Sequence, residues 1–310
     1  MKISVIGAGN VGATAANVIA LKGFASEVVL LDIKEGFAEG KAMDMMQTAK
    51  LFGMDTKITG VTGDYARTAG SSVIIITSGL ARRPGMTREE LVGTNAKIVK
   101  GVMDSCLQHS PEAVFIIVSN PADTLTYLAL KDSGLPRERV IGMSGILDSS
   151  RFVYFLSQAL GCNPNDIDGT VIGVHGDHMV PLTRFAYYKG VPVTELLSEA
   201  QLTKISQDTI AGGGTLTKLL GTSAWYAPGA SAATMAEAIA LDSGKLISCI
   251  AYLTGEFGEK DVCAAVPVIL GRKGIERIVD LSLNETEQAA FSASTDASRA
   301  VNEKLADCLK

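Results

Sequence analysis

Histidine and cysteine are scarce in this chain, and neither is grouped in the way that a zinc site needs. The sequence holds three histidines and five cysteines, and no two cysteines form a CxxC pair. His175 and His178 stand close together without such a pair nearby, so we expect no metal site. An odd number of irregularly spaced cysteines is also a poor disulfide framework, which predicts free thiols in a reducing compartment. The five are Cys106, Cys162, Cys249, Cys263 and Cys308.

The chain also lacks an excess of positive charge and any long uninterrupted apolar run. Its formal net charge is -5, whereas proteins that bind nucleic-acid phosphates or anionic membranes are usually basic. No apolar run reaches the ~18 residues that a membrane-spanning helix needs. The N-terminal segment resembles a signal peptide, but Gly7, Gly9 and Gly12 interrupt its apolar run too early. We therefore expect a cytoplasmic protein that binds neither nucleic acid nor membrane.

Enough apolar residues are present for two packed cores. Of the 310 residues, 47% are hydrophobic and 20% are charged, a balance typical of globular proteins. One hydrophobic core rarely extends over so long a chain, so the length favours two domains.

The first half alternates short β-branched runs with helical patterns. Strands are predicted over residues 3–6, 28–31, 73–77 and 114–118, and a helix is predicted over 13–22. Each run is continuously apolar, as in parallel strands that are buried on both faces. This alternation predicts an α/β fold with a doubly wound parallel sheet of the Rossmann type.

The pattern changes after residue 145. Two apolar runs, 247–254 and 262–270, flank a glycine-containing turn and predict an antiparallel strand pair. We therefore predict a Rossmann-type domain over 1–145 and a mixed α+β domain over 146–310. The other elements predicted in this half are strands over 169–173 and 182–186 and helices over 148–160, 200–220, 234–242 and 285–309.

The turn after the first predicted strand carries the GxGxxG spacing of dinucleotide-binding proteins. The pattern alone is weak, but here a predicted strand precedes it and a predicted helix follows it. Gly7 would make the tight turn, Gly9 would let the backbone approach a pyrophosphate, and Gly12 would let the helix pack against the strand. The helix N-terminus would offer unpaired N–H groups to the phosphates. The predicted cofactor contacts in this turn are Gly7, Ala8, Gly9, Asn10, Val11 and Gly12.

Asp32 ends the second predicted strand, where an acidic side chain accepts hydrogen bonds from the adenosine ribose. A carboxylate at this place repels a 2′-phosphate, so we predict NAD rather than NADP as the cofactor. Lys34 lies close in sequence and keeps NADP open as an alternative. The other alternative is a glycine turn that binds nothing, with Asp32 as a solvated charge.

Three further segments combine polar residues in an unusual way. They are the arginine-containing loop 79–88, the segment 146–151 and the histidine-containing segment 173–181. In this order and together with the glycine turn, they resemble the lactate/malate dehydrogenase family along the whole chain, and its malate-specific members most. The resemblance implies reversible hydride transfer between (S)-malate and NAD⁺, giving oxaloacetate and NADH, a step of the tricarboxylic acid cycle.

The resemblance assigns the catalytic roles to His175 and Asp148. Reduction of a 2-oxo acid needs a proton at the carbonyl oxygen as hydride reaches the carbon, and histidine titrates near neutrality. Asp148 would orient the ring and stabilise the imidazolium, so the family implies that the two side chains meet in space. The alternative for His175 is a hydrogen-bonded core histidine without a chemical role.

Arginines match the substrate ligands of the family. Arg151 would bind the C1 carboxylate with two hydrogen bonds, and it shares one helical face with Asp148. Arg88 would polarise the substrate carbonyl. Arg82 stands where arginine accompanies the distal carboxylate of malate and glutamine accompanies lactate, whereas its neighbour Arg83 is taken to face outward. A segment rich in glycine and proline is expected to close over a ligand.

Polar residues elsewhere match groups around the nicotinamide. Asn120 follows a predicted strand, at the carboxyl edge where α/β folds bind ligands, and would contact both substrate and cofactor. Ser223 matches a small hydroxyl near the substrate, with Thr222 as an alternative. The predicted cofactor contacts in this group are Asn95, Val118, Ser119 and Asn120.

Other functions and the assembly stay open at this point. A lactate or other 2-hydroxy-acid dehydrogenase is disfavoured by Arg82, because a buried arginine facing a methyl group lacks a partner. A non-enzymatic NAD-binding sensor could share the fold, although the set of acid, base and arginines favours chemistry. The family implies a homodimer or homotetramer, and an apolar face over 148–160 would suit a symmetric contact.

Overall fold

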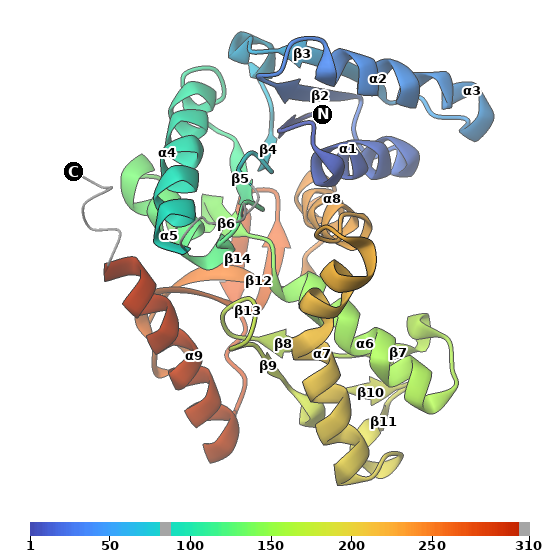
Figure 1. Ribbon diagram of the computed structural model, residues 1–310, viewed down its shortest axis with the longest axis vertical. Helices are drawn as coiled ribbons and strands as arrows, with labels where there is room; N and C mark the ends of the chain where they lie inside the picture. The colour runs from blue at the N-terminus through green and yellow to red at the C-terminus, as the bar shows by residue number, and fades with distance from the viewer. Residues whose placement is uncertain (81–87, 304–310) are drawn as a thin grey trace.

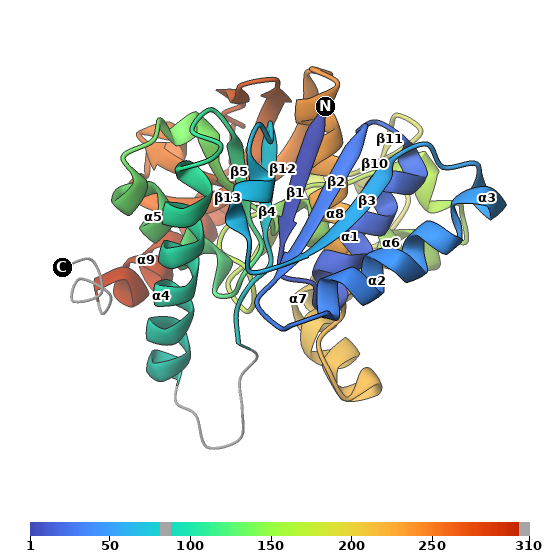
Figure 2. The same ribbon diagram turned by 90° about the horizontal axis from the view of Figure 1, so that it is seen from above.

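The protein is described by a computed structural model over residues 1–80 and 88–303, leaving the side chains of 88–90 aside. Within this part, one sheet has the strand order β14-β13-β12-β6-β5-β4-β1-β2-β3 (Figures 1 and 2). Its strands are β1 (Lys2–Ile6), β2 (Glu27–Asp32), β3 (Lys57–Thr62), β4 (Val73–Ile76), β5 (Val114–Ile117), β6 (Val140–Gly142), β12 (Lys245–Thr254), β13 (Lys260–Gly271) and β14 (Gly274–Ile278).

Strands β1 to β6 pair in parallel and are covered by helices on both faces, which confirms the predicted fold class. Successive residues of β4 point to opposite cores: Ile75 packs in one core with Ile19, and Ile74 packs in the other with Val99 and Leu125. The helices of this half are α1 (Asn10–Lys22), α2 (Phe37–Gln47), α3 (Ala49–Phe52), α4 (Arg88–Leu107) and α5 (Ala122–Ser133).

Strands from the second half extend this sheet. β12 and β13 form the predicted antiparallel pair, and β12 joins β6 through the pair Ile250 and Gly142. A Cβ on Gly142 would lie 2.4 Å from Thr126 Oγ1 and 2.7 Å from Ile250 Cδ1, so the junction requires glycine. The sequence predicted the strand pair but not its continuity with the parallel strands.

Helix α8 packs against α1, and α6, α7 and the short strands lie below it in Figure 1. The residues predicted as a strand over 182–186 are wrongly assigned, because Thr183–Phe185 form a 3₁₀ turn, and the predicted strand 169–173 shrinks to Val171–Ile172. The elements here are α6 (Gly145–Leu160), α7 (Glu199–Leu220), α8 (Tyr226–Ala240), β7 (Ile167–Asp168), β8 (Val171–Ile172), β9 (Val180–Pro181), β10 (Tyr187–Tyr188) and β11 (Val191–Pro192).

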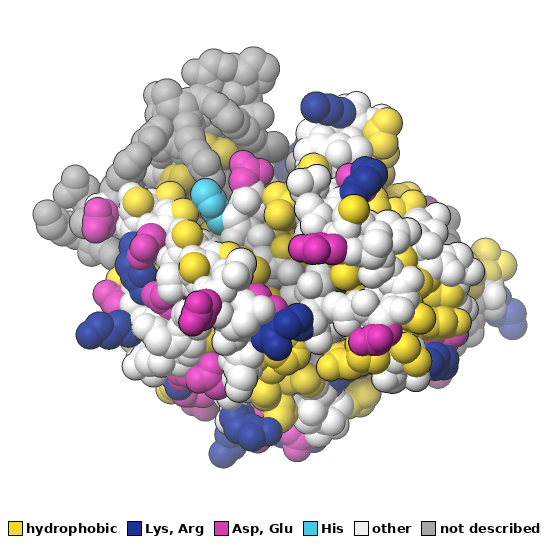
Figure 3. Space-filling view, turned by 90° about the horizontal axis from the view of Figure 1, so that it is seen from below, with side chains coloured by type: hydrophobic (Ala, Val, Ile, Leu, Met, Phe, Trp, Pro, Cys, Tyr) yellow, Lys and Arg dark blue, Asp and Glu magenta, His cyan; other side chains and the backbone are white. Residues whose placement is uncertain are grey.

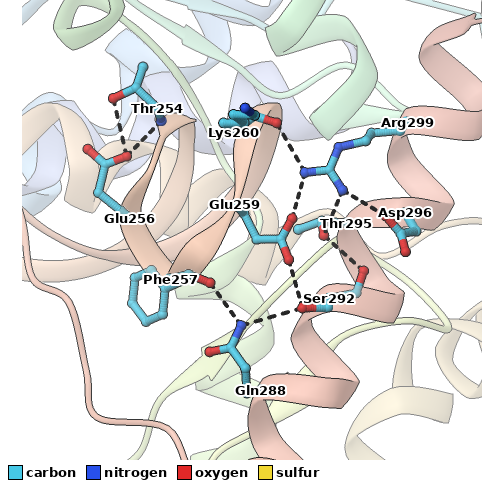
Figure 4. A network of polar contacts seen from close by, with 10 residues as sticks. All are labelled: Thr254, Glu256, Phe257, Glu259, Lys260, Gln288, Ser292, Thr295, Asp296 and Arg299. Atoms are coloured by element: carbon cyan, nitrogen blue, oxygen red, sulfur yellow. Dashed lines mark hydrogen bonds and ion pairs between the residues drawn. The ribbon is translucent and has the colours of Figure 1, made fainter.

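Helix α9 (Glu285–Glu303) is attached to the turn between β12 and β13 by a polar network (Figure 4). Arg299 donates a hydrogen bond to Glu259 Oε2 at 2.6 Å, and the Ser292 hydroxyl donates to Glu259 Oε1 at 2.7 Å. One turn earlier, Gln288 donates to the backbone carbonyl of Phe257 at 2.8 Å. These contacts fix the helix against the strand pair.

In the described ranges, no helix is long and apolar enough to cross a bilayer. The same residues contain no group of three or more His, Cys, Asp or Glu side chains placed to hold a metal ion. The free thiols found there are Cys106, Cys162, Cys249 and Cys263.

Candidate active site

A cavity of ≈ 500 Å³ opens at the carboxyl ends of β1, β2 and β4, and Gly7, Gly9 and Asp32 line it. Helix α1 begins at Asn10 with Gly9 as its N-cap residue, so no side chain caps the backbone N–H groups of its first turn. Unpaired N–H groups and the helix dipole favour an anion at this place. The geometry therefore fits the pyrophosphate of a dinucleotide.

The glycines of the turn differ in what surrounds them. A Cβ on Gly12 would lie 1.9 Å from the backbone oxygen of Gly7, so the helix can approach the strand only with glycine there. Gly7 has a φ of 105°, which L side chains rarely adopt. A Cβ on Gly9 would meet nothing within 4 Å, so its space is left for a ligand. The tight turn at Gly7 and the close packing at Gly12 agree with the sequence pattern, and the contact of Gly9 with a pyrophosphate stays a prediction.

The Asp32 carboxylate lies at the cavity wall and holds the glycine turn. Its Oδ2 accepts a hydrogen bond from Ala8 N–H at 2.7 Å, and its Oδ1 accepts one from Lys34 N–H at 2.9 Å. The Lys34 ammonium stacks over the Phe37 ring, 4.7 Å from its centroid. Asp32 therefore places a carboxylate on the wall of this cavity, which supports NAD over NADP.

A second cavity of ≈ 270 Å³ brings together residues from distant parts of the sequence. Its lining includes Ser223 but not Thr222, and Thr217 of α7 adds a hydroxyl that the sequence did not indicate. The predicted site residues that line it are Val11, Val118, Asn120, Arg151, His175 and Ser223.

His175, Asp148 and Arg151 form a connected group at this cavity. His175 Nδ1 lies 2.8 Å from Asp148 Oδ2, and Arg151 Nη1 donates to Asp148 Oδ1 at 2.9 Å. Asp148 stands in the first turn of α6 and is 1% exposed. Burial lowers the pKa of His175, but the charge and hydrogen bond of Asp148 and the charge of Asp123 outweigh it and raise this pKa above its usual value.

Buried side chains behind the cavity brace the loops that carry its lining. Asn95 is 2% exposed; its amide oxygen accepts from Leu80 N–H at 2.8 Å, and its amide nitrogen donates to the Asn120 carbonyl at 2.9 Å. The Ser119 hydroxyl donates to the Ser78 carbonyl at 2.5 Å. For Asn95, direct contact with the cofactor stays a prediction, since both ends of its amide are used to hold backbone.

Sequence reasoning missed one buried acid. Asp123, two residues after Pro121 in the first turn of α5, accepts a hydrogen bond from His175 N–H at 2.9 Å through Oδ2. The sequence offered one signal, a carboxylate two residues after Pro121, close to the Asn120-Pro121 segment. Arg82 lies outside the described residues, and Arg88 begins α4 without a described side chain.

The surface around the site carries both signs of charge. On the face seen in Figure 3, basic and acidic side chains are interspersed, and a histidine side chain reaches the surface beside a furrow. An extended basic patch of the kind that binds nucleic acid is not seen on the described part of this face.

The sheet, the glycine turn and the two cavities that residues of the β1–α1 segment line define a dinucleotide-dependent dehydrogenase of the α/β class. The family model for the lactate/malate dehydrogenase NAD binding domain matches residues 1–142, and that for the lactate/malate dehydrogenase alpha/beta C-terminal domain matches residues 146–307. The chain belongs to the lactate/malate dehydrogenase family.

Individual relatives resemble the chain over nearly its full length. It is 61% identical over 305 residues to a malate dehydrogenase of Bacteroides thetaiotaomicron, covering 98% of this chain and 97% of the relative. A malate dehydrogenase structure from Salinibacter ruber has a TM-score of 0.94 at 43% identity, covering 98% and 97% of the two chains. A lactate dehydrogenase of Cryptosporidium parvum, complexed with lactic acid and the nicotinamide cofactor, has a TM-score of 0.93 at 37% identity with the same coverage.

Proposed function

We propose that the chain is an NAD-dependent malate dehydrogenase, which reversibly oxidises (S)-malate to oxaloacetate, a reaction whose usual place is the tricarboxylic acid cycle. The observation that carries the proposal is the Asp148–His175 pair with Arg151, at a cavity that His175 and Arg151 both line. The relatives at 57–61% identity that carry the name malate dehydrogenase support the choice of substrate.

The residues present fit NAD. Gly7, Gly9 and the N-terminus of α1 would hold its pyrophosphate, and Asp32 would hold its adenosine ribose. Val11 and Val118 line the second cavity, of ≈ 270 Å³, where they would exclude water from the nicotinamide. When bound, NAD⁺ supplies the acceptor for the hydride that leaves C2 of malate.

His175 carries the proton. Its Nδ1 is held by Asp148, which leaves Nε2 as the ring atom that can exchange a proton with the substrate oxygen. In oxaloacetate reduction, Nε2 donates its proton to the developing alkoxide; in malate oxidation, neutral Nε2 accepts the hydroxyl proton. Because its neighbours raise the pKa of His175, the protonated form that oxaloacetate needs persists at higher pH.

Arg151 positions the substrate. Its Nη1 is bound to Asp148, whereas its buried Nε has no hydrogen-bond partner among the described residues. An unsatisfied buried donor is costly, so a substrate carboxylate that accepts from it would bind favourably. Asn120 and Ser223 line the same cavity and would hydrogen-bond the substrate oxygens, and Arg88 would polarise its carbonyl.

Arg82 is proposed to select malate over lactate. The close structural likeness to a lactate dehydrogenase means that the fold does not decide the substrate. An arginine would pair with the distal carboxylate of oxaloacetate, and it would lack a partner when pyruvate is bound.

The test is NADH oxidation with oxaloacetate and with pyruvate, using the wild type, Arg82→Gln and the control Arg83→Gln. We expect Arg82→Gln to lower kcat/KM for oxaloacetate by up to ~10⁴-fold with little loss for pyruvate. Arg83→Gln should change neither. Equal losses on both substrates would refute the role of Arg82, and wild-type protein that binds NADH but oxidises it with neither acid would refute the proposed activity.

The organisation of the chain belongs to the same proposal. We assign residues 1–145 to the NAD-binding domain and 146–310 to the catalytic domain, in a cytoplasmic homodimer or homotetramer. Large apolar side chains exposed on α2, α3, α6 and α8 support self-association: Met43 (65%), Phe52 (65%), Tyr154 (53%) and Tyr226 (73%). Sedimentation velocity distinguishes monomer, dimer and tetramer.

A further inference from the structure

The backbone around His175 is held at three consecutive residues by three different elements. Gly173 exchanges backbone hydrogen bonds with Ala265 of β13, donating at 2.8 Å and accepting at 3.0 Å. Val174 N–H donates to the Ser294 hydroxyl of α9 at 2.8 Å, and His175 N–H donates to Asp123 Oδ2 of α5 at 2.9 Å. Of these acceptors, only Asp123 can carry a charge.

Asp123 is an unusual choice for holding a backbone N–H, since a neutral acceptor would suffice. Its side chain is 3% exposed, and its second oxygen, Oδ1, has no hydrogen-bond partner among the described residues. It lines a cavity of ≈ 380 Å³ on which His175 also borders, together with the unpartnered hydroxyl of buried Ser298. Burying a carboxylate without a partner is costly, so the charge of Asp123 calls for a cation that compensates it.

The charges that face His175 differ in how they are neutralised. Asp148 binds the imidazole with one oxygen and the Arg151 guanidinium with the other, so Arg151 already balances one negative charge. Among the described side chains, those of residues 1–80 and 91–303, Asp123 forms no ion pair with an arginine or lysine. Within that described set, the ring of His175 is the cation that Asp123 can balance, and exposed Asp177 and His178 of the same loop are the other titratable neighbours.

We propose that Asp123 is a second positioning carboxylate for the proton carrier: it holds the His175 backbone through Oδ2, and its charge favours the protonated imidazole. This inference rests on the proposed function, in which His175 gives its proton to the substrate. Two carboxylates and one guanidinium then leave a net negative environment for the ring, which suits a group that must hold a proton until oxaloacetate arrives.

The titration of the group agrees with this geometry. Burial raises the pKa of Asp123 to about 7, although the hydrogen bond from His175 N–H and the charge of the ring act to lower it. The charge of Asp123 in turn helps to raise the pKa of His175, so each group stabilises the charged form of the other.

The test uses the conservative variant Asp123→Asn, which keeps an acceptor oxygen for His175 N–H and removes the charge. Two readouts are followed against pH: kcat/KM for oxaloacetate, and the ring ¹⁵N resonances of the histidines, of which the chain has three. We expect the midpoint of His175 to fall by about one pH unit or more in both. The matched control Ser294→Ala removes the acceptor of the adjacent Val174 N–H without changing charge, so it should lower kcat while the midpoint stays in place.

The outcomes separate the alternatives. A midpoint unchanged in Asp123→Asn, or moved equally in Ser294→Ala, would overturn the electrostatic role of Asp123. Asp123→Ser, which is smaller and also uncharged, gives the same test if the Asn variant does not fold. The NMR titration needs no turnover. If the wild type proved inactive with oxaloacetate, the proposed function would fail, but a lower His175 midpoint in Asp123→Asn than in wild type would still support the inference.

Discussion

At the scale of single residues, the chemistry depends on which of two nearby histidines carries the proton. His175 is bound to Asp148 through Nδ1, whereas exposed His178 lines only the neighbouring cavity. We expect His175→Asn to lower kcat by about 10²–10⁴-fold, because the substrate oxygen loses its proton donor, and His178→Asn to retain most activity. Steady-state rates with oxaloacetate and NADH measure both. Substantial turnover by the His175 variant would contradict the proton-carrier role.

The choice of cofactor depends on one carboxylate in the same way. Asp32→Asn keeps an acceptor for Ala8 N–H and removes the negative charge at the ribose end of the cavity. We expect the ratio of kcat/KM for NADPH to that for NADH to rise, since the repulsion of a 2′-phosphate is relieved. Initial rates with each cofactor give the ratio. An unchanged ratio would place the source of the preference elsewhere.

At the scale of elements, the β1–α1 turn separates a packing glycine from a binding glycine. A Cβ on Gly12 would collide with the Gly7 carbonyl, whereas a Cβ on Gly9 meets open space. Gly12→Ala should therefore lower the melting temperature markedly. Gly9→Ala should leave it unchanged and raise KM for NADH, because the methyl group occupies space left for the pyrophosphate. Thermal melts and NADH titrations of both variants make the comparison, and equal loss of stability in the two would contradict it.

The elements that the sequence predicted correctly are those with strong local patterns. The β-branched runs of β1, β2, β4 and β5 are long enough to identify parallel strands, and the glycine turn identifies the start of α1. The run 182–186 failed because a short apolar segment also suits a 3₁₀ turn. The Asp148–His175 contact followed from resemblance to a family rather than from spacing.

Other features depend on contacts between residues far apart in sequence, which no local pattern encodes. The pairing of Gly142 with Ile250 joins the two halves of the sheet, and nothing near either residue indicates it. In the sequence, Asp123 does not differ from an ordinary residue of a first helical turn, since acidic side chains are common there. Its function becomes visible only when the fold brings the His175 loop against α5.

At the scale of the whole molecule, the two buried carboxyls Glu259 and Asp123 make the free energy of unfolding change with pH in opposite directions. Burial raises the pKa of Glu259, but hydrogen bonds from Arg299 and Ser292 outweigh burial and hold this pKa below its usual range. Such a carboxylate stabilises the folded chain above its unfolded pKa, and this stabilisation is lost as the pH falls through the folded value. Asp123 behaves oppositely: with a pKa raised to about 7, its folded form binds the proton more tightly than the unfolded chain does.

A measurable difference in the pH dependence of stability follows from this sign. The contribution of Asp123 to stability is greatest below its unfolded pKa of about 4. This contribution declines as the pH rises through about 7, because folding must then bury an ionised carboxylate. Asp123→Asn removes that decline. We therefore expect the melting temperature of the variant, relative to wild type, to increase between about pH 5 and about pH 8.5. Ser294→Ala, which changes no charge, should differ from wild type by the same amount at every pH. If the difference for Asp123→Asn were constant, the Asp123 carboxyl of the wild type would not change ionisation over this range. The protonation of His175 would then depend on Asp148 and the ring, without Asp123.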